Sequence, residues 1–152
     1  MSLTRLHACC AARDEAGVLI SGVPGAGKSD LLLRLIGRGY RLVADDRVEL
    51  EDGLARAPAA LRGLIEIRGW GVIRRPFIEA VRPVLMVRLV RAGADVPRLP
   101  DCREAHDPET DLPVLWLDGM LASAPDRIDA ALDCLAGRAF RLPQGAMLTG
   151  DD

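Results

Sequence analysis

The stretch from Gly22 to Ser29 constrains the fold of this chain more than any other feature. It fits the G-x-x-x-x-G-K-[ST] pattern of a phosphate-binding loop. The apolar run before it, residues 17–21, predicts a buried strand, and the leucine-rich run after it, residues 30–36, predicts a helix. Glycines allow backbone N–H groups to turn toward phosphate oxygens, and the positive end of the helix adds to the same spot. The expected nucleotide-binding positions are Gly22, Val23, Pro24, Gly25, Ala26, Gly27, Lys28 and Ser29.

Lys28 is a second argument for a phosphate site. Among the chain's 20 lysine and arginine residues it is the only lysine. A compact ammonium group suits a phosphate loop as a point charge, which a planar guanidinium does not supply. In such loops the lysine reaches the β- and γ-phosphates, and the serine hydroxyl, here that of Ser29, ligates magnesium. The competing interpretation is a glycine-rich turn that caps a core helix.

Length and composition are those of an ordinary globular protein. The 152 residues predict one domain over 1–152. A net charge of −2 argues against general nucleic-acid binding. The sequence has no signal-like N-terminus and no apolar run of ~18 residues, so we expect a cytoplasmic protein without a membrane span. The cysteines lack zinc-site spacing and are expected to be small core residues, namely Cys9, Cys10, Cys102 and Cys134.

The patterns around the loop predict a mixed β-sheet with flanking helices. Residues 6–12 are apolar and should form a hairpin with the loop's own strand. The connection from Ser21 to Arg41 is long enough for a right-handed strand–helix–strand crossover into a strand at 41–44. That strand would then end at the same sheet edge as the loop, where open α/β sheets bind ligands. The predicted fold class is therefore α/β.

The rest of the chain has weaker signals. We expect a hairpin around Asp52-Gly53, a strand at 64–68 that Gly69-Trp70-Gly71 breaks, and a last clear strand at 84–90. Residues 91–113 are rich in prolines and acids and are predicted to be a flexible loop. Ser123 should start a helix with a capping box. The inward positions of that helix would be Ile128, Ala131, Leu132 and Leu135.

Asp45 and Asp46 follow the strand at 41–44 and are the natural candidates for phosphoryl-transfer chemistry. One could ligate magnesium while the other takes the proton from an acceptor hydroxyl. Because side chains alternate along a strand, only one of them should face the phosphates. The alternative is an aspartate pair that caps a turn. Glu66 fits a second metal-side carboxylate or a surface charge, and His7 fits a catalyst or a satisfied core residue.

Four blocks of sequence, in the same order, resemble the catalytic domain of HPr kinase/phosphorylase. They lie at residues 20–29, 38–46, 57–58 and 65–71, and the resemblance covers about residues 7–82. The most specific blocks are R-G-Y-R-L-V-A-D-D and E-I-R-G-W-G. The resemblance implies the fold of that domain. It also implies a bacterial serine kinase that phosphorylates HPr, the small phosphocarrier protein of the phosphotransferase system, using ATP and magnesium.

The resemblance also implies a role for individual residues. The implied catalytic residues are Asp46 as the proton acceptor, Lys28 as the phosphate contact, His7 as the active-site histidine, and Arg68 in support. The implied metal-side residues are Ser29, Glu66 and, in a supporting position, Asp45.

Departures from the family pattern narrow what the resemblance implies. Long-form members carry an N-terminal domain that would precede His7, so we expect a short form. After Arg82 no P-V-x-x-G-R-N-like segment occurs, and that segment is tied to the phosphorylase reaction. Pro24 and Trp70 stand where many members have Ser and Leu. We therefore predict weak or no phosphorylase activity and leave a homo-oligomer open. The alternatives are a kinase of another protein or a small molecule, and a non-catalytic nucleotide sensor.

Overall fold

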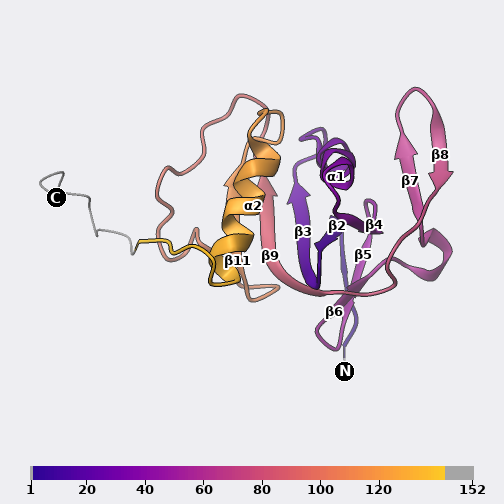
Figure 1. Ribbon diagram of the computed structural model, residues 1–152, viewed down its shortest axis with the longest axis horizontal. Coiled ribbons are helices and arrows are strands. Elements are labelled where there is room, and N and C mark those ends of the chain that lie inside the picture. Colours follow the sequence, from indigo (N-terminus) through magenta and orange to yellow (C-terminus); the bar gives the residue numbers. More distant parts are fainter. Residues whose placement is uncertain (1, 143–152) are drawn as a thin grey trace, which may run out of the picture.

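A six-stranded mixed sheet forms the centre of the computed structural model, which describes residues 2–142 (Figure 1). Its strand order is β10-β11-β9-β3-β2-β4. Strands β11, β9 and β3 run parallel, whereas β2 is antiparallel to both β3 and β4, and β10 is antiparallel to β11. This confirms the predicted α/β class. The bounds are β2 (Cys9–Arg13), β3 (Ala16–Gly22), β4 (Arg41–Ala44), β9 (Arg82–Leu89), β10 (His106–Asp107) and β11 (Leu112–Leu117).

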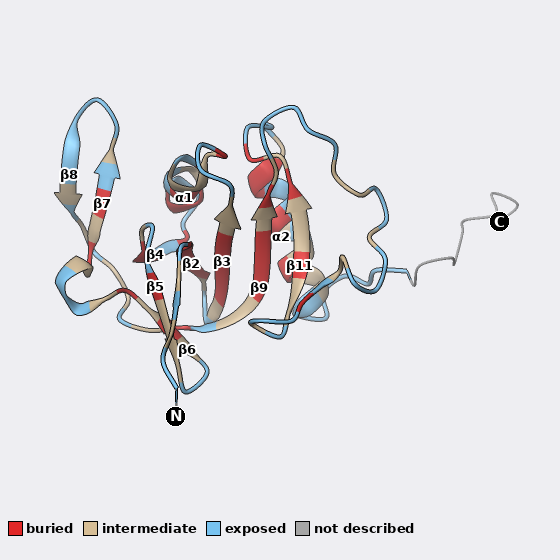
Figure 2. Cartoon of the chain, turned by 180° about the vertical axis from the view of Figure 1, so that it is seen from behind, coloured by how far each residue is buried: buried red, intermediate tan, exposed pale blue. Residues whose placement is uncertain are grey.

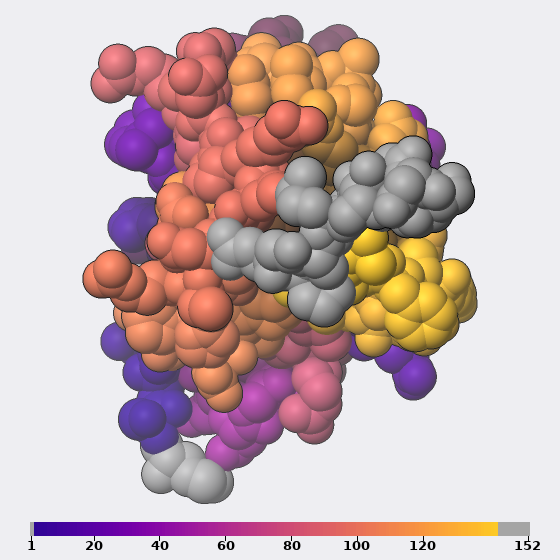
Figure 3. Space-filling view, turned by 90° about the vertical axis from the view of Figure 1, so that its left-hand side faces the viewer, coloured from indigo at the N-terminus to yellow at the C-terminus, as the bar shows by residue number. Residues whose placement is uncertain are grey.

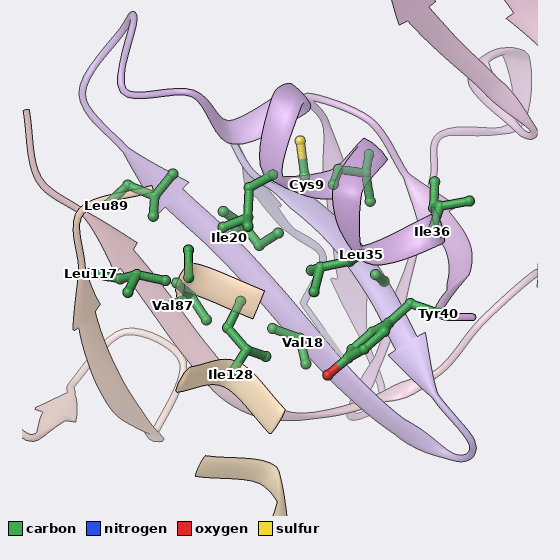
Figure 4. Packing of buried hydrophobic residues seen from close by; sticks show 14 of the residues in the cluster. Cys9, Val18, Ile20, Leu35, Ile36, Tyr40, Val87, Leu89, Leu117 and Ile128 are labelled. Atoms are coloured by element: carbon green, nitrogen blue, oxygen red, sulfur yellow. The ribbon is translucent and has the colours of Figure 1, made fainter. Parts of the chain in front are cut away.

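The two faces of this sheet bury different partners. Helices α1 (Lys28–Gly37) and α2 (Ala124–Leu135) cover one face, where Leu35 and Ile128 pack on Val18 and Val87 (Figure 4). A three-stranded sheet covers part of the other face. It consists of β1 (Thr4–Leu6), β5 (Val48–Glu51) and β6 (Leu54–Arg56) in the order β1-β5-β6. Alternation along β2 divides its side chains between the two clusters, with Cys9 and Ala11 in the first and Cys10 and Ala12 in the second.

A separate hairpin stands apart from the main sheet beside the end of β4 (Figure 1). It consists of β7 (Leu64–Ile67) and β8 (Gly71–Arg74), and the one-turn helix η1 (Ala59–Leu61) precedes it. Gly69 and Gly71 adopt positive φ angles of 88° and 135°, so the predicted break in the strand at these glycines is confirmed. Strand β7 ends at Ile67, one residue earlier than predicted.

The predicted topology around the loop is confirmed, with one correction. Strands β2 and β3 form the expected hairpin, and the connection through α1 passes over β2 to reach β4. Strands β3 and β4 therefore point the same way and end at the same sheet edge. The correction concerns residues 6–12, which are not one strand. The chain breaks at His7-Ala8 because β1 pairs with β5 in the smaller sheet, while β2 pairs in the large one.

The C-terminal third differs from prediction. Strand β9 is not the last strand, since β11 pairs with it in parallel and β10 falls inside the segment expected to be a loop. Pro113 obscured β11 in the sequence, because proline is disfavoured within central strands. Here it lies near the start of β11, which has only the two-residue β10 on its other side. The 91–113 segment covers this side of the sheet (Figure 3), with Trp116 Nε1 donating to the Glu104 carbonyl at 2.8 Å. Its flexibility stays a prediction.

Helix α2 and the cysteines need three smaller corrections. Ser123 precedes α2 but makes no capping hydrogen bond with its side chain, and its hydroxyl instead accepts from Arg127 Nε at 3.1 Å. Leu135 is 48% exposed at the last turn and does not join the core. The other three predicted inward positions are buried or pack against the core. The predicted burial of the cysteines holds for Cys9 and Cys10, whereas Cys102 is exposed and Cys134 is half-buried.

Candidate phosphate-binding site

The loop between β3 and α1 has a backbone that its glycines make possible. A Cβ on Gly22 would lie 2.8 Å from the Leu89 carbonyl oxygen, so β9 leaves no space for a side chain. Gly25 and Gly27 have φ angles of 83° and 94°, in the left-handed region that other residues adopt only with strain. The N–H of Ala26 donates to the Val23 carbonyl at 3.1 Å and closes the turn. Helix α1 begins directly after Gly27, and the first N–H groups of a helix have no partner within it.

Lys28 is half-buried at the start of α1. Its Nζ donates to the Gly22 carbonyl at 3.3 Å, so the side chain folds back across its own loop. The ammonium group is therefore held at the loop instead of extending into solvent. With the N-terminal end of α1 beside it, the loop collects positive potential at one point of the sheet edge.

Asp45 connects the loop to two other elements. The Ser29 hydroxyl donates to Asp45 Oδ1 at 2.7 Å, and the backbone N–H of Glu66 donates to Oδ2 at 3.1 Å. One carboxylate thus joins the first turn of α1, the end of β4 and strand β7. A serine hydroxyl next to a carboxylate offers the hard oxygen donors that magnesium prefers.

Asp46 is placed differently from its neighbour. It is exposed, and its φ of 70° lies in the left-handed region. Its N–H donates to Cys9 Sγ at 3.4 Å, and its carbonyl accepts from the Ala8 N–H at 3.2 Å. Among residues 2–142 its carboxylate has no hydrogen-bonding or ion-pair partner. As expected, only one aspartate of the pair contacts the loop. The reason differs from the predicted strand alternation, because both residues lie beyond the end of β4 and Asp46 has a left-handed backbone. The other carboxylate faces solvent, where it can receive a proton.

The side chains of Glu66, Arg68 and His7 make no hydrogen bond or ion pair with Asp45 or Asp46. The Glu66 and Arg68 side chains are exposed, and only the backbone N–H of Glu66 reaches Asp45. His7 is also exposed, so its interpretation as a satisfied core residue is wrong. Within residues 2–142, no three His, Cys, Asp or Glu side chains converge on a possible metal site. A magnesium ion at such a loop takes few protein ligands, because phosphates and waters supply the others. Ser29 and Asp45 fit that requirement.

Two features of this site had no signal in the sequence. The first is Cys9, whose buried Sγ lies 3.4 Å from Asp45 Oδ1. Burial raises the pKa of Cys9 to about 12, so the side chain stays a neutral thiol. Alternation along β2 predicts which face Cys9 occupies. It does not predict that Asp45, on another strand, meets it there.

The second feature is the connection from β11 to α2, which lies against the phosphate loop. A Cβ on Gly119 would be 3.3 Å from the Ala26 carbonyl, and one on Gly27 would be 3.3 Å from Met120 Sδ. Arg34 on α1 donates to the carbonyls of Gly119 and Leu121. The position of this connection beside the loop depends on β11, which the sequence pattern does not predict.

Comparison with known proteins identifies the family. The model of the family described as HPr Serine kinase C-terminal domain matches residues 2–88, which is more than half of the 152-residue chain. The chain belongs to the HPr serine kinase C-terminal domain family. The matched part of this family member contains the loop, the Asp45-Asp46 pair, the β7–β8 hairpin and His7, and it ends within β9.

Relatives agree with this assignment over the same part of the chain. The HPr kinase/phosphorylase of Clostridium novyi is 40% identical over 91 residues, which are 57% of this chain and 30% of that protein. The HPr kinase/phosphorylase of Chromobacterium violaceum is 49% identical over 84 residues, or 50% of this chain and 26% of the relative. The matched part of the chain therefore spans less than a third of the length of these relatives.

A solved structure supports the fold beyond the family match. The HPr(Ser) kinase/phosphatase of Coxiella burnetii superimposes with a TM-score of 0.71 at 24% identity, covering 89% of this chain and 92% of that one. Because this coverage exceeds the family match, the common fold extends into the C-terminal third. None of the helices within residues 2–142 has the length and apolar character needed to cross a membrane.

Proposed function

We propose that this chain is an ATP- and magnesium-dependent serine kinase domain whose acceptor is an HPr-type phosphocarrier protein. The main support is the 2.7 Å hydrogen bond from the Ser29 hydroxyl to Asp45 Oδ1, in a chain of this family. It joins a phosphate loop to the end of β4, which lies two strands away from β3 at the same sheet edge, the arrangement that a nucleotide with its metal ion requires. The acceptor is proposed from the names of the relatives, which are HPr kinase/phosphorylases. A cytoplasmic location is part of the same proposal.

Each proposed role is supported by the position of a side chain or by the family resemblance. Lys28 and the N–H groups of the loop bind the β- and γ-phosphates. Ser29 and Asp45, with Glu66 on the neighbouring hairpin, would hold magnesium, which offsets phosphate charge when bound. Asp46 accepts the proton of the acceptor serine hydroxyl as its oxygen bonds to the γ-phosphorus. The bond to the β-phosphate oxygen breaks, and ADP leaves. His7, as the active-site histidine, and Arg68, in support, complete the proposal, and both side chains are exposed.

The direction of the reaction is a separate part of the proposal. We expect weak or no phosphorylase activity, because the segment tied to that reaction has no counterpart after Arg82. Incubation with phosphoserine-HPr, inorganic phosphate and magnesium tests this expectation. Rapid release of pyrophosphate would contradict it.

The kinase proposal is tested with labelled ATP, magnesium and purified HPr-type proteins. We expect transfer to a serine with the wild-type protein and none with Asp46→Asn or Lys28→Ala. Tight ATP binding with no transfer to any HPr would instead favour a kinase with another acceptor or a nucleotide sensor. Thermal shift with ATP separates both from a loop that binds nothing, because a ligand stabilises the folded state according to its affinity.

A further inference from the structure

The Cys9 thiol contacts both aspartates of the site. Its Sγ lies 3.4 Å from Asp45 Oδ1 and accepts the N–H of Asp46, also at 3.4 Å. The Ser29 hydroxyl lies 3.9 Å from the same sulfur. The side chain is fully buried on β2 and points toward α1 (Figure 4). Cys9 therefore lies directly beneath the groups proposed to bind the metal.

The chemistry of these contacts determines their direction. A carboxylate can only accept, so the short contact with Asp45 uses the S–H as donor. The backbone N–H of Asp46 can only donate, so there the sulfur is the acceptor. One sulfur atom thus acts as donor to Asp45 and as acceptor from Asp46, the two residues that directly follow β4. Apolar side chains of the same size can do neither.

We propose that Cys9 is a positioning residue for the metal-side carboxylate Asp45 and for the turn at Asp46. This inference rests on the proposed function for its biological meaning. With the thiol in place, Asp45 receives donors from Cys9, Ser29 and the Glu66 backbone, which together set the rotation of its carboxylate. The Asp46 N–H contact holds the left-handed backbone that turns the second carboxylate outward. Partners behind metal-side groups commonly tune metal affinity in this way.

The test compares Cys9→Val with Cys9→Ser. Valine fills the buried site but removes donor and acceptor, whereas serine keeps both and places a hydroxyl among apolar side chains. The readout is the affinity for ADP by calorimetry, in magnesium and in EDTA, without any acceptor protein. We expect Cys9→Val to reduce the magnesium-dependent gain in affinity by about five- to tenfold. Cys9→Ser should retain that gain within about twofold, even though its melting temperature falls further.

Cys10 supplies the matched control. It is the next residue on β2 and is equally buried, but it points to the opposite face and belongs to the other cluster. Cys10→Val and Cys10→Ser should leave the magnesium-dependent gain unchanged. If valine at position 9 keeps the full gain, or if the gain follows melting temperature across all four variants, Cys9 is only a core residue and the proposal is overturned. If the wild-type protein fails to phosphorylate HPr, the proposed function is contradicted. The magnesium-dependent gain in ADP affinity still tests the role of Cys9, because it is measured without an acceptor protein.

Discussion

The phosphate loop and the β7–β8 hairpin both contact the Asp45 carboxylate but differ in how they are held. The loop connects the buried strand β3 to helix α1, and Lys28, Ser29 and Asp45 each have a hydrogen-bonding partner within the protein. Along the hairpin, Glu66, Arg68 and Trp70 are exposed, and the contrast is visible in Figure 2, where β3 and β9 are largely buried while β8 is largely exposed. The hydrogen bond from the Glu66 backbone N–H to the Asp45 carboxylate links the two regions.

The two regions therefore differ in how far their side chains are ordered before a ligand binds. The geometry of the loop region is fixed before any ligand binds, because buried contacts already restrict its side chains. Side chains on the hairpin must lose freedom when the nucleotide or the acceptor binds. Substitutions in the two regions should therefore act differently. Those near the loop can disturb folding and nucleotide binding together, whereas a substitution on the hairpin should not weaken both.

The largest effect is expected from Asp46→Asn. The amide cannot take up the hydroxyl proton, so phosphoryl transfer to the acceptor should fall on the order of 10³-fold. ADP affinity and the free energy of unfolding should stay close to wild type, because the side chain is exposed. Steady-state kinetics and calorimetry measure both. Unimpaired transfer would show that another group accepts the proton.

Gly22→Ala tests how tightly the start of the loop packs against β9. The added Cβ would meet the Leu89 carbonyl at 2.8 Å, and the strands must shift to accept it. We expect a loss of about 1–3 kcal/mol in unfolding free energy together with weakened ADP binding. The matched change on the hairpin is Gly69→Ala, where nothing lies within 4 Å and only the positive φ of 88° opposes the substitution. That variant should lose about 1 kcal/mol and bind ADP normally. Equal losses of stability and ADP affinity in chemical denaturation and calorimetry would contradict the comparison.

Glu66→Gln is expected to have a smaller, purely functional effect. The contact with Asp45 comes from the backbone N–H and survives the change, so only the exposed carboxylate is lost. We expect the magnesium requirement for transfer to rise about tenfold, with no change in melting temperature. A magnesium titration of the transfer rate measures this. A fall in melting temperature with an unchanged titration curve would assign Glu66 a structural role instead.

The smallest effect is expected from Trp70→Ala. Trp70 is 82% exposed, so its removal should change the free energy of unfolding by no more than about 0.5 kcal/mol. Trp116→Ala is the contrasting variant, because the indole N–H of Trp116 donates to Glu104 and its ring lies 5.7 Å from the Arg88 guanidinium carbon. That change should cost about 2 kcal/mol or more. Chemical denaturation of both variants measures the free energy of unfolding. A large loss of this free energy with Trp70→Ala would mean that the hairpin tip is covered.

Local patterns predicted the segments whose structure depends on neighbouring residues in the chain. The phosphate loop, the turn at Asp52-Gly53 and the break at Gly69 all rest on backbone conformations that glycine makes accessible. Patterns failed where pairing between distant segments decides the outcome. Strand β11 contains a proline that its place near the sheet edge tolerates, and residues 6–12 divide between two sheets. The environment of a strand is set by its partners, which a single segment does not reveal.

By itself the sequence determined that this chain carries a phosphate loop followed by a helix, with an aspartate pair at the end of a later strand. Only the tertiary structure decided what each aspartate contacts. Strand β2 lies between β3 and β4, and this order brings Cys9, Ser29 and Asp45 together across 16 to 36 residues of sequence. The backbone conformation of a glycine loop is a local property. A hydrogen bond between residues far apart in the sequence forms only when the order of the strands has placed both partners at one edge of the sheet.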